Sequence, residues 1–180
     1  GRTNSTIRTE LELLRACLRW HFGDQAPEIS APPPSKPRDR YLTKAERDRL
    51  LDAIETPHVR LFVTLALTTG ARMSALLDLT WDRVDFEHGT IDLNPAGRHV
   101  TNKRRTVVPM NNRARAALQE AKDAALSDYV IEYAGKPVGS IKKAIASAAR
   151  RSGVPCSPHV FRHTAAVWMA EADVPMEKIA

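Results

Sequence analysis

Cysteine and long apolar runs are scarce in this 180-residue chain, and no signal peptide is recognisable. The two cysteines, Cys17 and Cys156, lie far apart and form no metal-ligand pattern, so we expect reduced thiols in a cytosolic protein. The longest apolar run, around residues 61–67, is far too short to span a membrane. The chain opens with Gly1 rather than Met, and we interpret it as a piece of something longer.

Positive charge is in excess. The chain has 27 Lys and Arg residues against 21 Asp and Glu, which gives a formal net charge of +6 and a pI near 9.6. This balance favours a polyanionic partner, with nucleic acid first and an anionic membrane surface second. With 43% hydrophobic and 27% charged residues, the composition is that of a globular protein rather than a disordered one.

The pattern of residues divides the chain into three parts. Leucines recur at helical spacing up to about His21, which predicts a helix within residues 1–24. Residues 25–40 contain five prolines and end in basic residues, so we interpret them as an extended linker and a domain boundary. Residues 41–180 are expected to form a compact domain.

Within that domain, the residues that begin and end helices predict a mostly helical structure. Thr43 and Glu46 have the spacing of a capping box, and Pro57 and Gly70 bracket a helix rich in Leu, Phe and Val. Three short segments are typical of an antiparallel sheet, residues 83–86, 90–93 and 106–110. Two later segments return to helical spacing, residues 111–125 and 140–153, while residues 129–133 are ambiguous and are interpreted as a possible strand.

The stretch SPHVFRHT groups ionisable side chains near the start of an expected helix. Ser157 is placed to cap that helix, with Pro158 as its first residue. At about 100° per residue, His159, Arg162 and His163 share one face. Donors beside the positive end of a helix suit an anion such as a phosphate, whereas a metal is disfavoured because Arg162 adds a fixed positive charge. A solvated helix surface without function is the alternative.

Two other segments carry positive charge in unusual settings. Arg72 follows a glycine in the apolar stretch TTGARMSALLDLTW, where a guanidinium is costly unless it is paired, faces an anion or extends out to water. The basic connection GRHVTNKRRTVV lies between two expected strands, and its polar residues are placed to touch a DNA backbone or are simply solvated. These residues are Arg98, His99, Asn102, Lys103, Arg104 and Arg105.

Taken together and in this order, the segments resemble the tyrosine recombinases of the phage integrase family. The matching pieces are TTGARMSALLDLTW, a strand pair that holds TNKRRTVVPM, and PHVFRHT with its His-x-x-Arg motif. The resemblance covers roughly residues 41–180, and residues 1–24 resemble the last helix of the family's core-binding domain. It implies the family's catalytic fold, mainly α with a small antiparallel β-sheet.

The resemblance also implies a reaction: site-specific integration or excision of mobile DNA through a 3′-phosphotyrosyl intermediate, without metal or cofactor. Arg72 and Arg162 would clamp the non-bridging phosphate oxygens. His159 would donate a hydrogen bond to the phosphate or help deprotonate the tyrosine, and Lys103 would protonate the leaving 5′-oxygen. His163 would make a supporting phosphate contact.

Two residues depart from the family pattern. Ala75 stands where relatives often carry a carboxylate that orients the first arginine, so either Asp78 or Asp85 substitutes or Arg72 is held otherwise. Lys103 lies nearer to the following strand than the lysine of many relatives, although it is the only lysine in the turn.

The nucleophile of the family is expected after the His-x-x-Arg helix, but Tyr41, Tyr129 and Tyr133 all precede it. We therefore predict that this chain contains no nucleophile and does not cleave DNA by itself. The alternatives are a truncated, non-catalytic DNA-binding protein derived from a recombinase, and a helical interaction module with incidental charge. A type IB topoisomerase shares the same site chemistry.

The expected partner is double-stranded DNA, bound by a homotetramer of the full-length enzyme in the nucleoid-containing cytoplasm of a bacterium, with no membrane involved. Beyond the catalytic set, the predicted DNA contacts are Arg38, Arg40, Arg98, Arg104, Arg105, Lys142 and Lys143.

Overall fold

The computed structural model describes residues 2–34, 39–95, 97 and 106–175. Contacts within the chain divide it into two units, Gly1–Asp39 and Arg40–Ala180. Among the described residues, no helix combines the length and the apolar character that a membrane span requires.

The first unit is a helix with the following segment folded back along it. Helix α1, Asn4–Phe22, begins where the Thr3 hydroxyl accepts a hydrogen bond from the Thr6 backbone N–H. A short 3-10 helix, η1, Gly23–Gln25, follows, and the Arg8 guanidinium then donates to the Pro32 carbonyl. No residue of α1 is buried, and the Trp20 side chain is 89% exposed, so the first unit alone leaves the helix without a core.

The second unit contains the remaining elements. Its helices are α2 (Lys44–Asp52), α3 (Pro57–Thr69), α4 (Met73–Leu77), the 3-10 helix η2 (Trp81–Arg83), α5 (Asn112–Asp123), α6 (Lys142–Ser152) and α7 (Pro158–Glu171). Its strands are β1 (Val84–Asp85), β2 (Thr90–Asp92), β3 (Val107–Pro109), β4 (Glu132–Tyr133) and β5 (Lys136–Pro137). The predicted fold class, mainly helical with a small antiparallel sheet, is confirmed.

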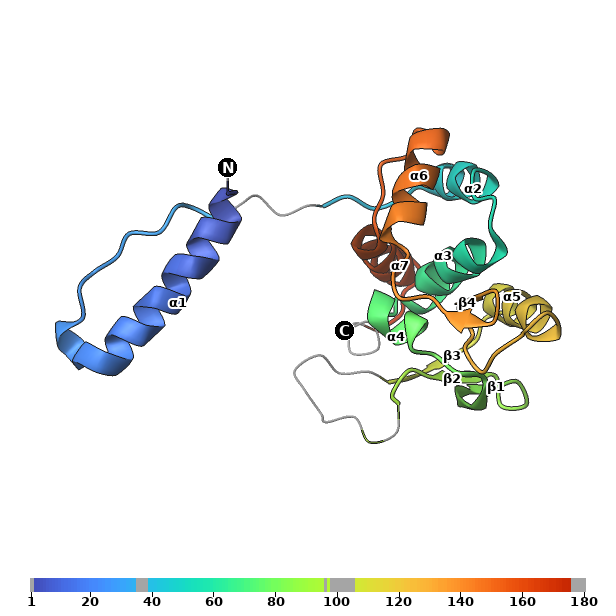
Figure 1. Cartoon of the computed structure of the whole chain (residues 1–180). Coiled ribbons are helices and arrows are strands. Elements are labelled where there is room, and N and C mark those ends of the chain that lie inside the picture. Colours follow the sequence, from blue (N-terminus) through green and yellow to red (C-terminus); the bar gives the residue numbers. More distant parts are fainter. Residues whose placement is uncertain (1, 35–38, 96, 98–105, 176–180) are drawn as a thin grey trace. The chain divides into compact units, whose positions relative to one another are not determined.

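Helix α3 is the centre of the second unit. Seven consecutive residues, Leu61–Leu67, are buried, as expected for a helix that is apolar on nearly all sides. It packs against α7 and α5, while α2 packs against α6 (Figure 1). Phe62 and Phe161 are the largest fully buried side chains, so α7 is fixed by its own apolar face.

Both sheets are antiparallel and small. Strands β1, β2 and β3 lie side by side in that order, with Val84 opposite Ile91 and Ile91 opposite Val108. Pro109 is the last residue of β3, which is an outer strand of this sheet. Its missing N–H therefore costs no hydrogen bond between strands. The connection from β2 to β3 contains residues 98–105, which lie outside the described part of the chain.

The predicted helix boundaries of the second unit are confirmed at most positions. Thr43 and Glu46 form a reciprocal capping box, Pro57 opens α3, and Gly70 ends it in the left-handed conformation with φ +65°. The Asn111 side chain caps α5. The interpretation of residues 129–133 as a possible strand is confirmed in part: Tyr129 forms an isolated antiparallel bridge with Thr80, and Glu132–Tyr133 form β4.

Thr164 is a fully buried polar residue that ties the start of the second unit to α7. Its hydroxyl accepts a hydrogen bond from the Leu42 N–H at 2.9 Å and donates one to the Val160 carbonyl at 2.7 Å. Leu42 is also fully buried, so water is not available to replace this partner of its N–H. The bond therefore anchors the chain just before α2 against the middle of α7.

Replacement of Thr164 by valine should destabilise the second unit by about 1–3 kcal/mol, because it leaves the buried Leu42 N–H without a partner. Urea denaturation followed by far-UV circular dichroism measures the change. Thr164→Ser keeps the hydroxyl and is the matched control, with a smaller loss. Equal stability of the valine variant and the parent chain would contradict the anchoring role.

Candidate functional site

Arg72 is positioned by the short turn between α3 and α4. Its carbonyl accepts hydrogen bonds from the Ala75 and Leu76 N–H groups, which makes Arg72 the residue that caps α4. The residue is half-buried. Because the flanking Ala71 and Ala75 are buried, the turn has little freedom to move the arginine away from the core surface.

The start of α7 positions the other candidate side chains. Ser157 occupies the capping position, but the prediction that its side chain caps the helix is wrong, since only its carbonyl is bonded, by the Phe161 N–H. His159 is exposed near the first turn, whereas Arg162 and His163 are half-buried one turn later.

Arg162 joins α7 to the turn that carries Arg72. Its Nη1 atom donates to the Gly70 carbonyl oxygen at 2.6 Å, across 92 positions of the sequence. The pKa of Arg162 is lowered from its ordinary value, first by burial and then by the positive charge of Arg72. The hydrogen bond thus brings the Arg162 side chain to the turn that carries Arg72, and both residues are half-buried.

Two arginines in this position are chemically suited to an oxyanion. Two guanidinium groups offer several N–H donors in fixed planes, and a bound phosphate would convert their mutual repulsion into attraction. The exposed His159 lies one helical turn before Arg162 and adds a donor on the same helix. The described residues contain no group of three or more His, Cys, Asp or Glu side chains suited to a metal ion.

Asp85 does not take the place of the carboxylate that is missing at Ala75. Of the two acidic residues that the sequence suggested for this role, Asp85 is therefore wrong. Its carboxylate accepts hydrogen bonds from the His88 N–H at 2.8 Å and from the His88 ring at 2.7 Å. These bonds lower the pKa of Asp85. Ala75 itself is buried in the core, where a carboxylate would need a partner.

The remaining predicted DNA contacts are spread over the chain. Lys142 and Lys143 are exposed in the first turn of α6. The Arg40 guanidinium is bonded to both carboxylate oxygens of Glu46, at 2.6 and 3.1 Å, so a DNA contact would compete with an existing ion pair. The other predicted residues lie outside the described part of the chain: Arg38, Arg98, Lys103, Arg104 and Arg105.

Two features of the site have no signal in the sequence. The Gly70 carbonyl is a backbone acceptor, and nothing in the residue pattern indicates that Arg162 is its donor. The buried bond between Thr164 and Leu42 links two segments 122 positions apart. A glycine that ends a helix and a threonine on an apolar face are each common enough to pass unnoticed.

Comparison with known proteins places these features in context. A sequence model described as the phage integrase family matches residues 40–180. The integrase of Salmonella phage P22 is 29% identical over 192 aligned positions, which cover 96% of this chain and 49% of that protein. A shufflon-specific DNA recombinase of Escherichia coli is 33% identical over 126 positions, 65% of this chain and 32% of that protein.

Solved structures share the fold. An integrase of the Tn1549 transposon, in complex with circular intermediate DNA, superposes with a TM-score of 0.80 at 18% identity, covering 99% of this chain and 70% of that one. A lambda integrase tetramer bound to a Holliday junction gives a TM-score of 0.75 at 17% identity, covering 96% and 56%. The chain spans about half the length of the P22 integrase and about a third of the shufflon recombinase.

The Arg40–Glu46 ion pair should make stability depend on pH. The Arg40 hydrogen bond, followed by that of the Thr43 N–H, lowers the pKa of Glu46 from its ordinary 4.5 to about 2. A depressed carboxyl pKa contributes stability that is complete above about pH 4.5 and is lost as the pH falls toward 2. Glu46→Gln should cost roughly 1 kcal/mol at neutral pH, since the pair is only partly buried.

Urea midpoints between pH 7 and pH 3 measure this effect. Glutamine retains the capping acceptor, so the difference between Glu46→Gln and the parent chain should shrink steadily on acidification. Glu120→Gln, at an exposed position of α5, is the control and should show no such trend. A difference that stays constant with pH would contradict the ion-pair assignment.

The arginine pair should bind a free oxyanion. Inorganic phosphate at ten times its dissociation constant should stabilise the chain by about 1.4 kcal/mol, and Arg162→Ala or Arg72→Ala should remove that gain. Thermal melts at matched ionic strength measure it, with Arg49→Ala, an exposed arginine of α2, as the control that retains the gain. Equal phosphate responses in all four proteins would contradict a built anion site.

Proposed function

This chain belongs to the phage integrase family, and on that premise we propose that it takes part in site-specific DNA recombination by breaking and rejoining strands. The comparisons support the coarse assignment, because relatives include an integrase and a site-specific recombinase. The observation that carries the proposal is the hydrogen bond from Arg162 to the Gly70 carbonyl, which brings this arginine to the turn of Arg72.

The proposed reaction replaces one phosphodiester oxygen by another. A tyrosine oxygen forms a bond to phosphorus while the bond from phosphorus to the 5′-oxygen breaks, and the product is a 3′-phosphotyrosyl link with a free 5′-hydroxyl. The reverse attack by a 5′-hydroxyl restores the DNA backbone. No external energy source is required, because each step exchanges one phosphate ester for another.

The side chains supply the positive field that this transfer needs. Negative charge accumulates on the two non-bridging oxygens in the transition state, and Arg72 and Arg162 are our candidates to hold them. The hydrogen bond to Gly70 fixes one edge of the Arg162 guanidinium, so less side-chain freedom is lost when the phosphate binds. Burial strengthens the attraction, since the local dielectric is lower than that of water.

The proton transfers are assigned to neighbouring residues as part of the proposal. Lys103 would protonate the leaving 5′-oxygen, and His159 would donate to the phosphate or accept the tyrosine proton. The exposure of His159 leaves it accessible to a DNA backbone. His163, half-buried beside Arg162, would make a supporting phosphate contact.

We assign the nucleophile to none of the tyrosines within residues 1–180. Tyr133 lies in the β4–β5 hairpin, where its ring is 5.2 Å from that of His58. Tyr129 forms a backbone bridge with Thr80. Tyr129 and Tyr133 therefore belong neither to α7 nor to the turn that carries Arg72. Tyr41 lies in the segment before α2. By analogy with the lambda integrase tetramer, the working assembly would be a tetramer on DNA.

A duplex-binding assay tests the proposal. The chain should bind DNA with an affinity that falls steeply between 50 and 200 mM salt, with a log–log slope of about −0.9 per phosphate contacted. The double variant Arg72→Ala/Arg162→Ala should bind more weakly and lose about one unit of slope, because both arginines serve one phosphate.

Arg49→Ala is the matched control, because its side chain is exposed and lies outside the candidate site. Lys142→Ala/Lys143→Ala should also reduce the slope, by up to two units if both lysines contact phosphates. A double arginine variant that binds as tightly as the parent chain, with an unchanged slope, would overturn the assignment of the site to DNA phosphate.

A further inference from the structure

The last residue of α3 carries a hydroxyl that holds the backbone next to the candidate site. The Thr69 hydroxyl donates a hydrogen bond to the Leu65 carbonyl at 2.7 Å, one turn earlier in the helix. The same oxygen accepts a hydrogen bond from the Ala71 N–H at 3.2 Å. Because a hydroxyl has one donor and two acceptor positions, Thr69 can bond to the helix and to the turn at the same time.

The Ala71 N–H depends on this acceptor. The Gly70 N–H still bonds back into α3, to the Ala66 carbonyl at 3.1 Å. Gly70 then turns the chain out of the helix with φ +65°, and the next N–H donates to the Thr69 hydroxyl instead. Ala71 is only 5% exposed, so water is a poor replacement for that hydroxyl.

Thr69 and Arg162 hold opposite edges of one peptide group. The Gly70 carbonyl and the Ala71 N–H belong to the same planar, trans peptide unit, in which they point in opposite directions. The N–H edge is bonded to the Thr69 hydroxyl, and the carbonyl edge accepts the Arg162 Nη1 hydrogen bond at 2.6 Å. A rotation of this peptide group would break both bonds together and turn the carbonyl away from Arg162.

We propose that Thr69 is a positioning residue for Arg162, which it holds through the orientation of the peptide group between Gly70 and Ala71. Glycine by itself permits several orientations, because without a Cβ it reaches backbone angles that other residues avoid. The Thr69 hydroxyl selects the orientation in which the carbonyl faces α7. The inference rests on the proposed function, since Thr69 would act on a DNA phosphate only through Arg162.

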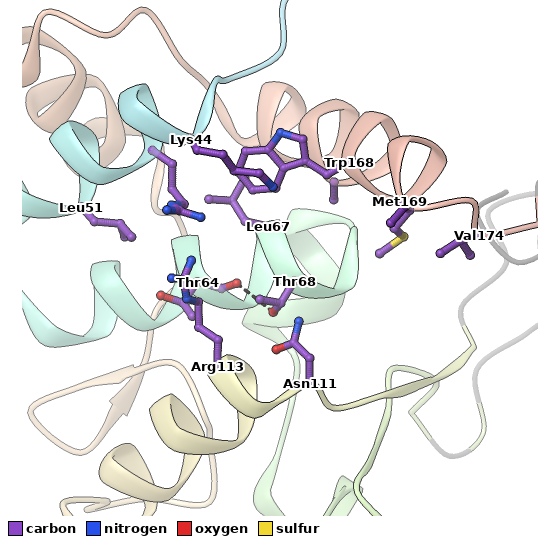
Figure 2. Close-up of a pocket in the computed structure, with 13 residues that line it drawn as sticks. Lys44, Leu51, Thr64, Leu67, Thr68, Asn111, Arg113, Trp168, Met169 and Val174 are labelled. Carbon is purple, nitrogen blue, oxygen red and sulfur yellow. Dashed lines mark hydrogen bonds between the residues drawn. The ribbon is translucent and has the colours of Figure 1, made fainter.

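Thr68 is the matched control, because it has the same side chain in the same turn of α3. It is half-buried like Thr69, and its hydroxyl donates to the Thr64 carbonyl at 2.8 Å (Figure 2). Among the described residues, this hydroxyl accepts no hydrogen bond from the turn that leads to Arg72. Valine at either position removes the bond to the helix backbone, but only Thr69→Val also removes the acceptor of the Ala71 N–H.

Titration of the whole chain with inorganic phosphate, followed by heteronuclear NMR, tests the inference. Thr69→Val should weaken phosphate binding roughly tenfold, because a smaller fraction of molecules then holds Arg162 in place. Hydrogen exchange of the Ala71 amide should accelerate roughly tenfold in the same variant. Thr69→Ala, which also lacks the hydroxyl, should behave like Thr69→Val. Thr69→Ser keeps the hydroxyl and should restore both values, and Thr68→Val should leave both unchanged.

The outcomes separate this inference from the proposed function, with melting curves confirming that each variant is folded. A threonine that only stabilised α3 would change the melting temperature but not the phosphate affinity of folded molecules. Phosphate binding that is unchanged in Thr69→Val, or equally weakened in Thr68→Val, would therefore overturn the positioning role alone. A serine variant as weak as the valine variant would do the same. A parent chain that binds phosphate no better than Arg72→Ala/Arg162→Ala would overturn the proposed site and the positioning role with it.

Discussion

The hydrogen bond from Arg162 to the Gly70 carbonyl is the interaction on which the candidate site depends. It joins the end of α3 to α7 and so places one arginine next to another that lies 90 positions earlier in the sequence. Glycine is needed here for its left-handed backbone rather than for room, since an added Cβ would make only ordinary contact with Ala165 at 3.5 Å. That backbone turns the chain sharply between the helix end and Arg72.

The site is held together at the expense of local stability. The Arg162 guanidinium is partly buried near Arg72, and its pKa is lowered by burial and then by the positive charge of Arg72. The packing of Phe161 and Phe62 in the core, together with the buried Thr164 hydroxyl, offsets this cost at a distance. Functional sites commonly contain such unfavourable local features, held in place by the rest of the fold.

Local patterns in the sequence were enough to predict most of the elements but not their contacts. The capping box at Thr43, the proline that opens α3 and the glycine that ends it each act within a few residues, so their effects are readable from the chain. The segment around Val130 has a strand-like composition, but its pairing partner near Leu79 lies about 50 positions earlier and could not be predicted from local pattern. Likewise, the sequence allows Asp85 to pair with Arg72, but in the structure its carboxylate is hydrogen-bonded to His88. Long-range partners of this kind leave no periodic signal.

Helix α7 contributes to the candidate site and to the core. Arg162 belongs to the arginine pair, whereas Phe161 and Thr164 are buried and hold the helix in the core. A helix moves largely as a rigid body, so a backbone motion that carries Arg162 away from Gly70 requires α7 to slide or rotate. Either motion would disturb the buried bond between Thr164 and Leu42, which is costly to break. The buried bond between Thr164 and Leu42 therefore helps to keep Arg162 at Gly70, although it touches neither of these residues.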